Sequence, residues 1–269
     1  MRELFLDEGI EYYAVLDIND VIQTYPELIE REGFTPRSLV VYLVPYYVSG
    51  AVNLSTYATS LDYHICITEI NLRLAERLKQ LYPEAKMKGY GDHSPIDEVD
   101  AAVKAGLGVR GKNHLLINEK FGSYVFIGEM ITDIEADKLG TTPLSSPKSC
   151  IDCGRCAEVC PTGTLRCGAP CLSAITQRKG ELTETEAEIM RSVGTAWGCD
   201  LCQTVCPYNE SPKQTPIAFF HRERVTKLTQ DIVNSYSREE LRRRAFGWRG
   251  RAVLLRNLGI LSDTDESEN

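Results

Sequence analysis

Apolar positions in the first half of the chain follow two different spacings. From Ser38 to Val48, β-branched, aliphatic and aromatic residues form an almost continuous run between Pro36 and Gly50, which predicts a buried strand. Between Ile65 and Leu81 the apolar residues recur every three or four positions, which predicts an amphipathic helix. The first half of the chain therefore contains both helix and strand.

A second helix and two further strands are predicted downstream. Ser94 precedes Pro95 and is followed by an acid three residues later, so we expect Ser94 to be the N-cap of a helix from Pro95 to Ala105. Glycines at positions 106 and 108 should end this helix. Strands are expected over 114–117 and 124–131, with a turn through Phe121-Gly122-Ser123 between them. Together these elements indicate an α/β layered domain.

Composition shifts divide the chain into four predicted parts. An α/β domain covers 1–145, a cysteine-rich unit follows over 146–211, and a C-terminal helical segment occupies 212–261. Residues 262–269 contain four acids and no apolar side chain, so they should form an acidic tail. Proline and hydroxyl residues over 141–148 indicate a linker. Within the third part, 239–258 has the pattern of one arginine-rich helix.

Charge and hydropathy exclude several classes of protein. The 269 residues carry a net charge of −8, which argues against a broad basic face for nucleic acid. The longest apolar run is interrupted by Pro45 and is shorter than the roughly 18 residues of a membrane span. Acids at the N-terminus are unlike a signal peptide. We expect a cytoplasmic protein without a membrane partner.

The cysteines are the main chemical signal. Nine of the ten lie between Cys150 and Cys206, a density that indicates metal or redox chemistry in a reducing compartment. The first four have the spacing C-x2-C-x2-C-x3-C-P, and a second set, ending in Cys206-Pro207, has the spacing C-x2-C-x3-C-P. The first spacing is that of bacterial ferredoxins that bind two [4Fe–4S] clusters. We therefore predict a ferredoxin-like unit that holds two such clusters.

Crossed ligation distributes the thiols between the two clusters. In two-cluster ferredoxins the fourth cysteine of a run ligates the other cluster. The first cluster is then held by Cys150, Cys153, Cys156 and Cys206. The second is held by Cys160, Cys199 and Cys202, and its fourth ligand is either Cys171 or Cys167.

Other interpretations of these residues carry less weight. Structural zinc favours paired C-x2-C hooks, which the three-thiol loop and the Cys-Pro endings match poorly. Disulfides are disfavoured in this compartment. Cys66 lies among apolar residues and is predicted to be a buried core thiol, and His221 lies in a charged run and is predicted to be a surface residue.

Several short segments together resemble the epoxyqueuosine reductase family. They are Tyr57-Ala58, Asp62-Tyr63-His64, Asp92-His93-Ser94-Pro95, Ala105-Gly106-Leu107-Gly108, Gly111-Lys112-Asn113, Phe121-Gly122-Ser123-Tyr124, Gly128-Glu129-Met130, Gly198-Cys199-Asp200-Leu201-Cys202-Gln203, Val205-Cys206-Pro207 and Leu255-Arg256-Asn257. Their order and spacing are kept over about residues 38 to 258. The resemblance implies a cobalamin-binding first domain that receives electrons from two [4Fe–4S] clusters.

The resemblance also implies a reaction and site residues. Members of this family reduce the epoxide of epoxyqueuosine in tRNA to the alkene of queuosine. Asp92 corresponds to the family's acid at the cobalamin and would protonate the departing oxygen. From the residues alone, however, Asp92 is most simply a turn residue. Cys171 matches the family's extra cluster ligand, in preference to Cys167.

The first domain offers further candidate contacts for the cofactor. Tyr63 and His64 open the predicted amphipathic helix, and Lys112 and Asn113 lie in the turn after the glycine pair. Each is either a cobalamin contact or an ordinary solvent-facing residue. The glycine pair itself follows a helix and is better explained as a C-cap turn than as a phosphate loop.

The predicted clusters and the arginine run also suggest partners and alternative functions. Electrons would come from an external low-potential flavodoxin or ferredoxin. The arginine run between Arg242 and Arg251 is the obvious candidate for contact with tRNA, and a solvated helix face explains it equally well. Two alternatives are a corrinoid-dependent reductase of a small molecule, similar in logic to reductive dehalogenases, and an electron-transfer protein without a substrate of its own.

Overall fold

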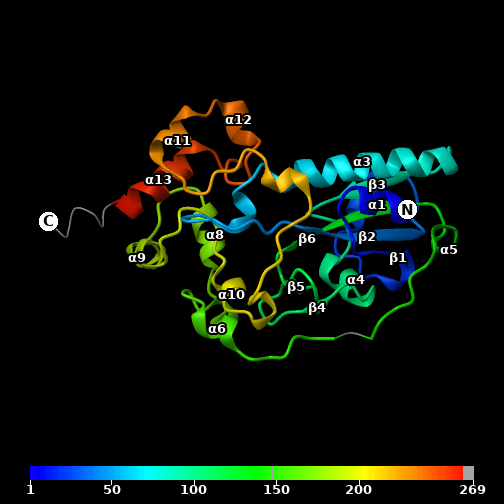
Figure 1. Cartoon of the computed structure of the whole chain (residues 1–269), viewed down its shortest axis with the longest axis horizontal. Coiled ribbons are helices and arrows are strands. Elements are labelled where there is room, and N and C mark those ends of the chain that lie inside the picture. Colours follow the sequence, from blue (N-terminus) through cyan, green and yellow to red (C-terminus); the bar gives the residue numbers. More distant parts are fainter. Residues whose placement is uncertain (147, 263–269) are drawn as a thin grey trace. The chain divides into compact units, whose positions relative to one another are not determined.

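The computed structural model describes residues 1–146 and 148–262, and these form two compact units (Figure 1). The first unit contains residues 1–46, 64–152 and 215–217. The second contains residues 47–63 and 153–214, together with the described residues from Ala218 on. This division differs from the contiguous domains 1–145, 146–211 and 212–261 that we predicted, because 47–63 packs with the cysteine-rich part and 215–217 packs with the first unit.

A four-stranded antiparallel sheet forms the centre of the first unit. Its order is β1 (Tyr13–Asp17), β2 (Ser38–Pro45), β6 (Val125–Thr132) and β3 (Met87–Tyr90). All eight residues of β2 are buried, which confirms the predicted buried strand, although it ends at Pro45. Sequence reasoning missed β1 and β3. Because β6 has neighbours on both sides, its residues can reach solvent only from the faces of the sheet.

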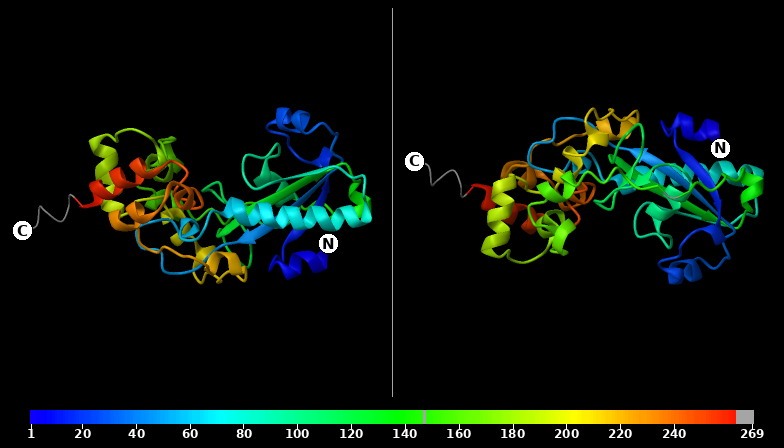
Figure 2. Two further views of the ribbon diagram at one scale, coloured as in Figure 1. Left: turned by 90° about the horizontal axis from the view of Figure 1, so that it is seen from above. Right: turned by 90° about the horizontal axis from the view of Figure 1, so that it is seen from below.

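Two helices cover the two faces of this sheet. The first is α3 (Tyr63–Leu81), which begins two residues before the predicted Ile65. The Tyr42 hydroxyl donates a hydrogen bond to Asn71 Oδ1 of α3 at 3.0 Å. The second is α4 (Glu98–Lys104), whose alanines pack in one apolar cluster with β2 and β6. Figure 2 shows α3 running along the sheet.

The start of α4 differs from the prediction. Asp97 is the N-cap, and its Oδ1 accepts a hydrogen bond from the Asp100 amide at 2.9 Å. Ser94 and Pro95 precede the helix in a non-helical segment, because Ile96 forms a β-bridge with Gln23. The predicted N-cap at Ser94 is therefore wrong by three residues. The predicted end is confirmed by Gly106, which has a φ of +72°.

The predicted strand over 114–117 is shorter and lies in a second, two-stranded sheet. There β5 (Leu116–Ile117) pairs with β4 (Val109–Arg110). Three short helices complete the first unit: α1 (Arg2–Asp7), α2 (Pro26–Glu32) and α5 (Ala136–Leu139).

The second unit consists of short helices joined by loops. They are α6 (Arg155–Val159), α7 (Thr164–Cys167), α8 (Leu172–Gln177), α9 (Glu184–Val193), α10 (Leu201–Thr204), α11 (Gln230–Ser235), α12 (Arg238–Arg242) and α13 (Arg251–Ser262). Their core is centred on Trp197, which is fully buried. The indole of Trp197 donates a hydrogen bond to the Tyr57 hydroxyl at 3.0 Å, and the Ser55 amide donates to the Trp197 carbonyl at 2.7 Å. These contacts hold the 47–63 segment in the second unit.

The single helix predicted over 239–258 is wrong, because a turn separates α12 from α13. Within the turn, Gly250 has a φ of +89°. A Cβ on Gly247 would lie 1.6 Å from the Leu241 carbonyl oxygen, so only glycine permits this close approach.

Two further predictions concern the C-terminal tail and membrane spans. The predicted acidic tail, 262–269, lies outside the described residues except for Ser262, where α13 ends. Over 1–146 and 148–262, no helix is long and apolar enough to cross a membrane.

Candidate functional site

The cysteines of the second unit lie on short helices and the loops between them. All ten cysteines of the chain are free thiols. Cys66 is buried, as predicted, and burial raises the pKa of its thiol to about 12. By contrast, Cys153 and Cys171 are exposed, and the other predicted cluster ligands are half-buried. Cys150 belongs to the first unit, where its amide donates to the Arg110 carbonyl at 3.1 Å.

Three thiols predicted for the second cluster are electrostatic neighbours. Burial raises the pKa of Cys199, and with the added effects of the Cys171 and Cys160 thiols it reaches about 11. Cys171 is the N-cap of α8, and Cys199 precedes α10. The fourth member, Cys202, lies on α10. Thiols from three different segments of the chain thus influence one another electrostatically.

Cys160 and Cys167 differ in their surroundings. Burial acts to raise the pKa of Cys160, but hydrogen bonds from the Thr162 hydroxyl and from backbone amides at the start of α7 lower it overall. N–H donors directed at a sulfur are typical of thiolates that bind iron–sulfur clusters. The Cys167 thiol instead donates to the Gly163 carbonyl of its own turn at 3.3 Å. Among the residues described, no three histidine, cysteine or acidic side chains are arranged to hold a metal ion.

Asp92 lies in the turn that follows β3. Its Oδ1 accepts a hydrogen bond from the His93 amide at 2.8 Å. Its Oδ2 lies 3.7 Å from Nε2 of His64, near the start of α3. The Asp92 side chain is 62% exposed, so it is accessible to a ligand. The structure therefore brings together two of the predicted site residues, Asp92 and His64.

The other candidate contacts are in different settings. The Tyr63 ring makes an edge contact with Tyr57, with centroids 6.5 Å apart. Lys112 donates to Asp152 Oδ1 at 2.5 Å and lines a cavity of about 560 Å³ with Arg110 and other residues. Asn113 is buried, and its Nδ2 has no hydrogen-bond partner. An orphaned buried donor of this kind is unfavourable unless a bound group satisfies it.

The arginines of the predicted RNA-contact run have several roles. Arg244 is buried, donates to the Glu223 carbonyl and lies 3.6 Å from the Glu223 carboxylate. Arg251 donates to the Tyr236 carbonyl. Arg242 and Arg243 are exposed. Only part of the run is therefore available to a partner.

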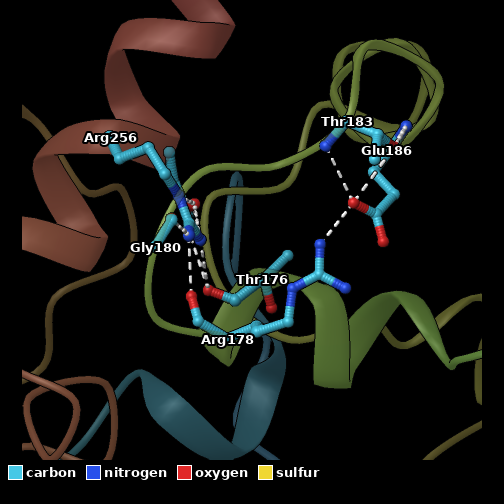
Figure 3. Close-up of polar contacts among 7 residues, drawn as sticks. Thr176, Arg178, Gly180, Thr183, Glu186 and Arg256 are labelled. Carbon is cyan, nitrogen blue, oxygen red and sulfur yellow. Dashed lines mark hydrogen bonds and ion pairs between the residues drawn. The ribbon is translucent and has the colours of Figure 1, made fainter.

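Arg256 of α13 fixes the loop that follows α8 (Figure 3), and the neighbouring Asn257 adds two further hydrogen bonds. The Arg256 guanidinium donates to the carbonyls of Arg178, at 2.7 Å, and Gly180. The Asn257 amide donates to the carbonyls of Thr176 and Ala196, each at 2.7 Å. Thr176 follows Cys171 in α8, and Ala196 precedes Cys199. These hydrogen bonds tie the two thiol-bearing segments to one helix.

Comparison with known proteins identifies the family to which the chain belongs. The family model described as "4Fe-4S double cluster binding domain" matches residues 149–209. An epoxyqueuosine reductase of Listeria monocytogenes is 32% identical, over 96% of this chain and 73% of the relative. One from Lactococcus garvieae is 33% identical, over 73% of this chain and 57% of the relative. The chain belongs to the epoxyqueuosine reductase family.

Solved structures of epoxyqueuosine reductases share the fold. The enzyme from Streptococcus thermophilus has a TM-score of 0.77 and 23% identity, over 100% of this chain and 85% of that chain. A second structure was solved with an epoxyqueuosine-modified tRNA-Tyr stem loop, and its TM-score is 0.73 at 21% identity, over 97% of this chain and 80% of that chain. These confirm the predicted mixed α/β fold with an iron–sulfur domain.

Sequence reasoning gave no role to two acids in this part of the chain, the half-buried Glu98 and the buried Glu129. Burial, together with the negative charges of Asp92 and Asp97, raises the pKa of Glu98 to about 7. Burial likewise raises the pKa of Glu129 to about 8; the Ser94 hydroxyl opposes this effect, while Glu98 and Asp97 add to it. An acid in the middle of an otherwise apolar strand was the available signal for Glu129.

We predict that Asn257→Ala destabilises the segments that carry Cys171 and Cys199. The substitution removes two buried hydrogen bonds and leaves two carbonyls unsatisfied, which should lower the free energy of unfolding by about 2–4 kcal/mol. Denaturant unfolding of the reconstituted protein measures this effect. Asn234→Ala, at an exposed position of α11, is the control and should change stability little. Equal stability of the two variants would show that the α13 contacts are dispensable.

Proposed function

We propose that this chain is an epoxyqueuosine reductase, which reduces the epoxide of epoxyqueuosine in tRNA to the alkene of queuosine. The observation that carries the proposal is the similarity to the Listeria monocytogenes enzyme over 96% of the chain. Within that span lie a match to a double-cluster domain and a separate unit in which Asp92 is accessible beside His64. The chain spans between about half and three quarters of the length of these curated relatives, so their activity is a proposal for this chain.

Two [4Fe–4S] clusters would carry electrons through the second unit. The proposed ligands of the first are Cys150, Cys153, Cys156 and Cys206, and those of the second are Cys160, Cys171, Cys199 and Cys202. The electrostatic interaction of Cys199 with Cys160 and Cys171 supports the second set. The electrons would come from an external flavodoxin or ferredoxin.

Cobalamin would be held by the first unit. The residues there fit a polar cofactor: the orphaned Nδ2 of Asn113 offers a buried donor, and His64 lies beside the accessible Asp92. Tyr63 precedes His64 at the start of α3 and would contribute its ring, whereas Lys112 is already paired with Asp152. When bound, cobalamin supplies a low-potential metal centre that can deliver electrons to the carbon–oxygen bond.

Asp92 is the proposed proton donor. Opening a carbon–oxygen bond reductively consumes two electrons and one proton at the departing oxygen. The helix dipole would have opposed a protonated Asp92 at a helix N-terminus. Because α4 begins at Glu98 and is capped by Asp97, Asp92 lies outside its first turn. His64 is positioned to hold the carboxyl in place.

The tRNA substrate would contact the second unit through an exposed aromatic ring. Trp248 is 53% exposed, and its indole donates to Gln177 Oε1 at 3.2 Å. The Arg249 guanidinium stacks on this ring at 3.6 Å from its centroid, and Arg242 and Arg243 are exposed nearby in sequence. A ring with an adjacent guanidinium is suited to stacking against an unpaired base. Since the proposed substrate is a tRNA, we also propose a cytoplasmic location.

Replacing either candidate fourth ligand tests the cluster assignment. We expect Cys171→Ser to lose one cluster, so that anaerobically reconstituted protein retains about half of its iron and acid-labile sulfide. Cys167→Ser is the matched control and should retain both clusters, since the Cys167 thiol is engaged within its own turn. The reverse result would move the ligand to Cys167, and full zinc occupancy with negligible iron would refute the clusters.

The activity is tested with tRNA from a queuosine-deficient host. Reduced wild-type enzyme should convert epoxyqueuosine to queuosine, as measured by nucleoside analysis after digestion. Asp92→Asn should lower turnover by at least about a hundredfold, the usual contribution of a positioned acid, while it retains both clusters and cobalamin. Unchanged epoxyqueuosine with the loaded wild type would favour reduction of a small molecule. Protein that fails to retain cobalamin through gel filtration would favour an electron carrier.

Substitution of the exposed indole tests the proposed tRNA contact. We expect Trp248→Ala to weaken binding of the anticodon stem loop about tenfold, because one base–aromatic stack is worth roughly 1–3 kcal/mol. Fluorescence anisotropy with a labelled stem loop measures the affinity. Tyr208→Ala, at another exposed aromatic residue of the second unit, is the control. Equal affinity of wild type and Trp248→Ala would exclude this surface.

A further inference from the structure

Tyr25 is an exposed aromatic residue to which neither the core of the first unit nor the proposed site gives a role. Its exposed fraction is 44%. Of the phenylalanine, tyrosine and tryptophan residues described in the first unit, Tyr25 alone is exposed. It directly precedes α2, a helix that has no buried residue. Burial in a core therefore does not explain a large ring at this position.

Main-chain hydrogen bonds hold the segment that carries Tyr25 against the chain that leads into α4. The amides of Thr24 and Tyr25 donate to the Pro95 carbonyl at 2.8 and 3.3 Å. Beside them, Gln23 and Ile96 form an antiparallel β-bridge. The backbone therefore fixes the location of Tyr25, whatever its own side chain contacts.

The Tyr25 ring contacts the imidazole of His93, the residue that follows Asp92. The two ring centroids are 5.0 Å apart, and the ring planes are inclined by 50°. His93 is also exposed, and its φ of +42° is a left-handed conformation that a residue with a Cβ adopts at a cost. Its amide donates to Asp92 Oδ1 at 2.8 Å. We call Tyr25 and His93 the aromatic pair.

An enzyme that acts on a nucleotide of a folded RNA must compensate for lost base stacking. The target base leaves its stack when it enters the site, and it loses the free energy of that stack. Proteins offset this loss by stacking the base on tyrosine, histidine, phenylalanine or tryptophan side chains. Such a side chain must lie near the reacting group, since base and epoxide belong to one nucleotide. The aromatic pair meets this condition, because His93 is the next residue after Asp92.

We propose that the aromatic pair is a stacking site for a flat nucleobase of the tRNA substrate, beside the epoxide that Asp92 protonates. This inference rests on the proposed function. The base of the modified nucleotide itself is favoured, because a short chain joins it to the epoxide ring. A neighbouring base of the anticodon loop has the same chemistry, and the experiments separate the two sources. In either case the pair binds and orients the substrate and takes no part in proton transfer.

Removal of the Tyr25 ring tests the proposal. In protein loaded with clusters and cobalamin, Tyr25→Ala should weaken binding of the epoxyqueuosine-modified anticodon stem loop about tenfold, the usual contribution of one base stack. Tyr25→Phe keeps the ring and should bind like wild type. Leu81→Ala, which removes another exposed apolar side chain of the same unit, is the control. Fluorescence anisotropy measures the affinity, and denaturant unfolding checks that each variant is folded. Equal affinity of wild type and Tyr25→Ala would overturn the proposal.

The second ring is tested by His93→Gly. Glycine adopts a positive φ without strain, so this variant removes the imidazole and keeps the turn. We expect it to bind the stem loop about tenfold more weakly than wild type. His93→Tyr supplies a ring again and should restore most of the affinity. Wild-type affinity of His93→Gly would overturn the role of the pair.

Free epoxyqueuosine nucleoside identifies which base is stacked. Its competition with the labelled stem loop measures its affinity for wild type and for Tyr25→Ala. Weaker binding of both nucleoside and stem loop by Tyr25→Ala would assign the pair to the modified base. Weaker binding of the stem loop alone would assign it to a neighbouring base of the loop.

Steady-state kinetics separate a binding role of Tyr25 from an effect on Asp92. Tyr25→Ala should raise KM about tenfold and change kcat little, because the proton donor is retained. A lower kcat with unchanged KM would overturn the stacking role. A loaded wild type that binds the stem loop but leaves epoxyqueuosine unreduced would overturn the proposed function, whereas the anisotropy comparison would still decide whether the pair binds a base.

Discussion

The antiparallel pairing of β2 with β6 is the constraint on which the first unit depends. It places β6 in the interior of the sheet, so that every side chain of β6 must enter one of two covered faces. On one face, Gly128 lies under the Tyr42 ring, where a Cβ would be 2.3 Å from a ring atom. On the other face, Glu129 is enclosed beneath α4. The same pairing therefore creates both the close packing of α3 and the buried acid.

The Asp92 turn is positioned by this arrangement rather than by its own sequence. It follows β3, at the edge of the sheet, and precedes the extended segment that Ile96 fixes through its bridge to Gln23. His64 of α3 lies 3.7 Å from its carboxylate, and Glu98 of α4 interacts with it electrostatically. Residues from helices on opposite faces of one sheet thus influence a single carboxyl. This is why an exposed residue has a defined electrostatic environment.

The second unit is organised by different forces. Its helices are short, and the loops between them must place sulfur atoms rather than bury apolar faces. Polar side chains of α13 therefore stabilise it by hydrogen bonds. Asn257 and Arg256 donate to backbone carbonyls in the thiol-bearing segments. The Thr183–Glu186 capping box and the Arg178–Glu186 ion pair close the same loop (Figure 3). The part of this unit that a family model for a double-cluster domain matches lies within residues 149–209.

The sequence by itself determined whatever depends on local spacing. Cysteine spacing predicted the iron–sulfur unit, a continuous apolar run predicted β2, and three- and four-residue periodicity predicted α3. Tertiary contacts decided the rest. Pairing of Ile96 with Gln23 displaced the start of α4, and the contact of Gly247 with Leu241 broke the predicted C-terminal helix. The buried Glu129 and its neighbours Glu98 and Asp92 come from separate elements, and only the folded sheet brings them together, because burial and charge proximity depend on distance in space and not along the chain.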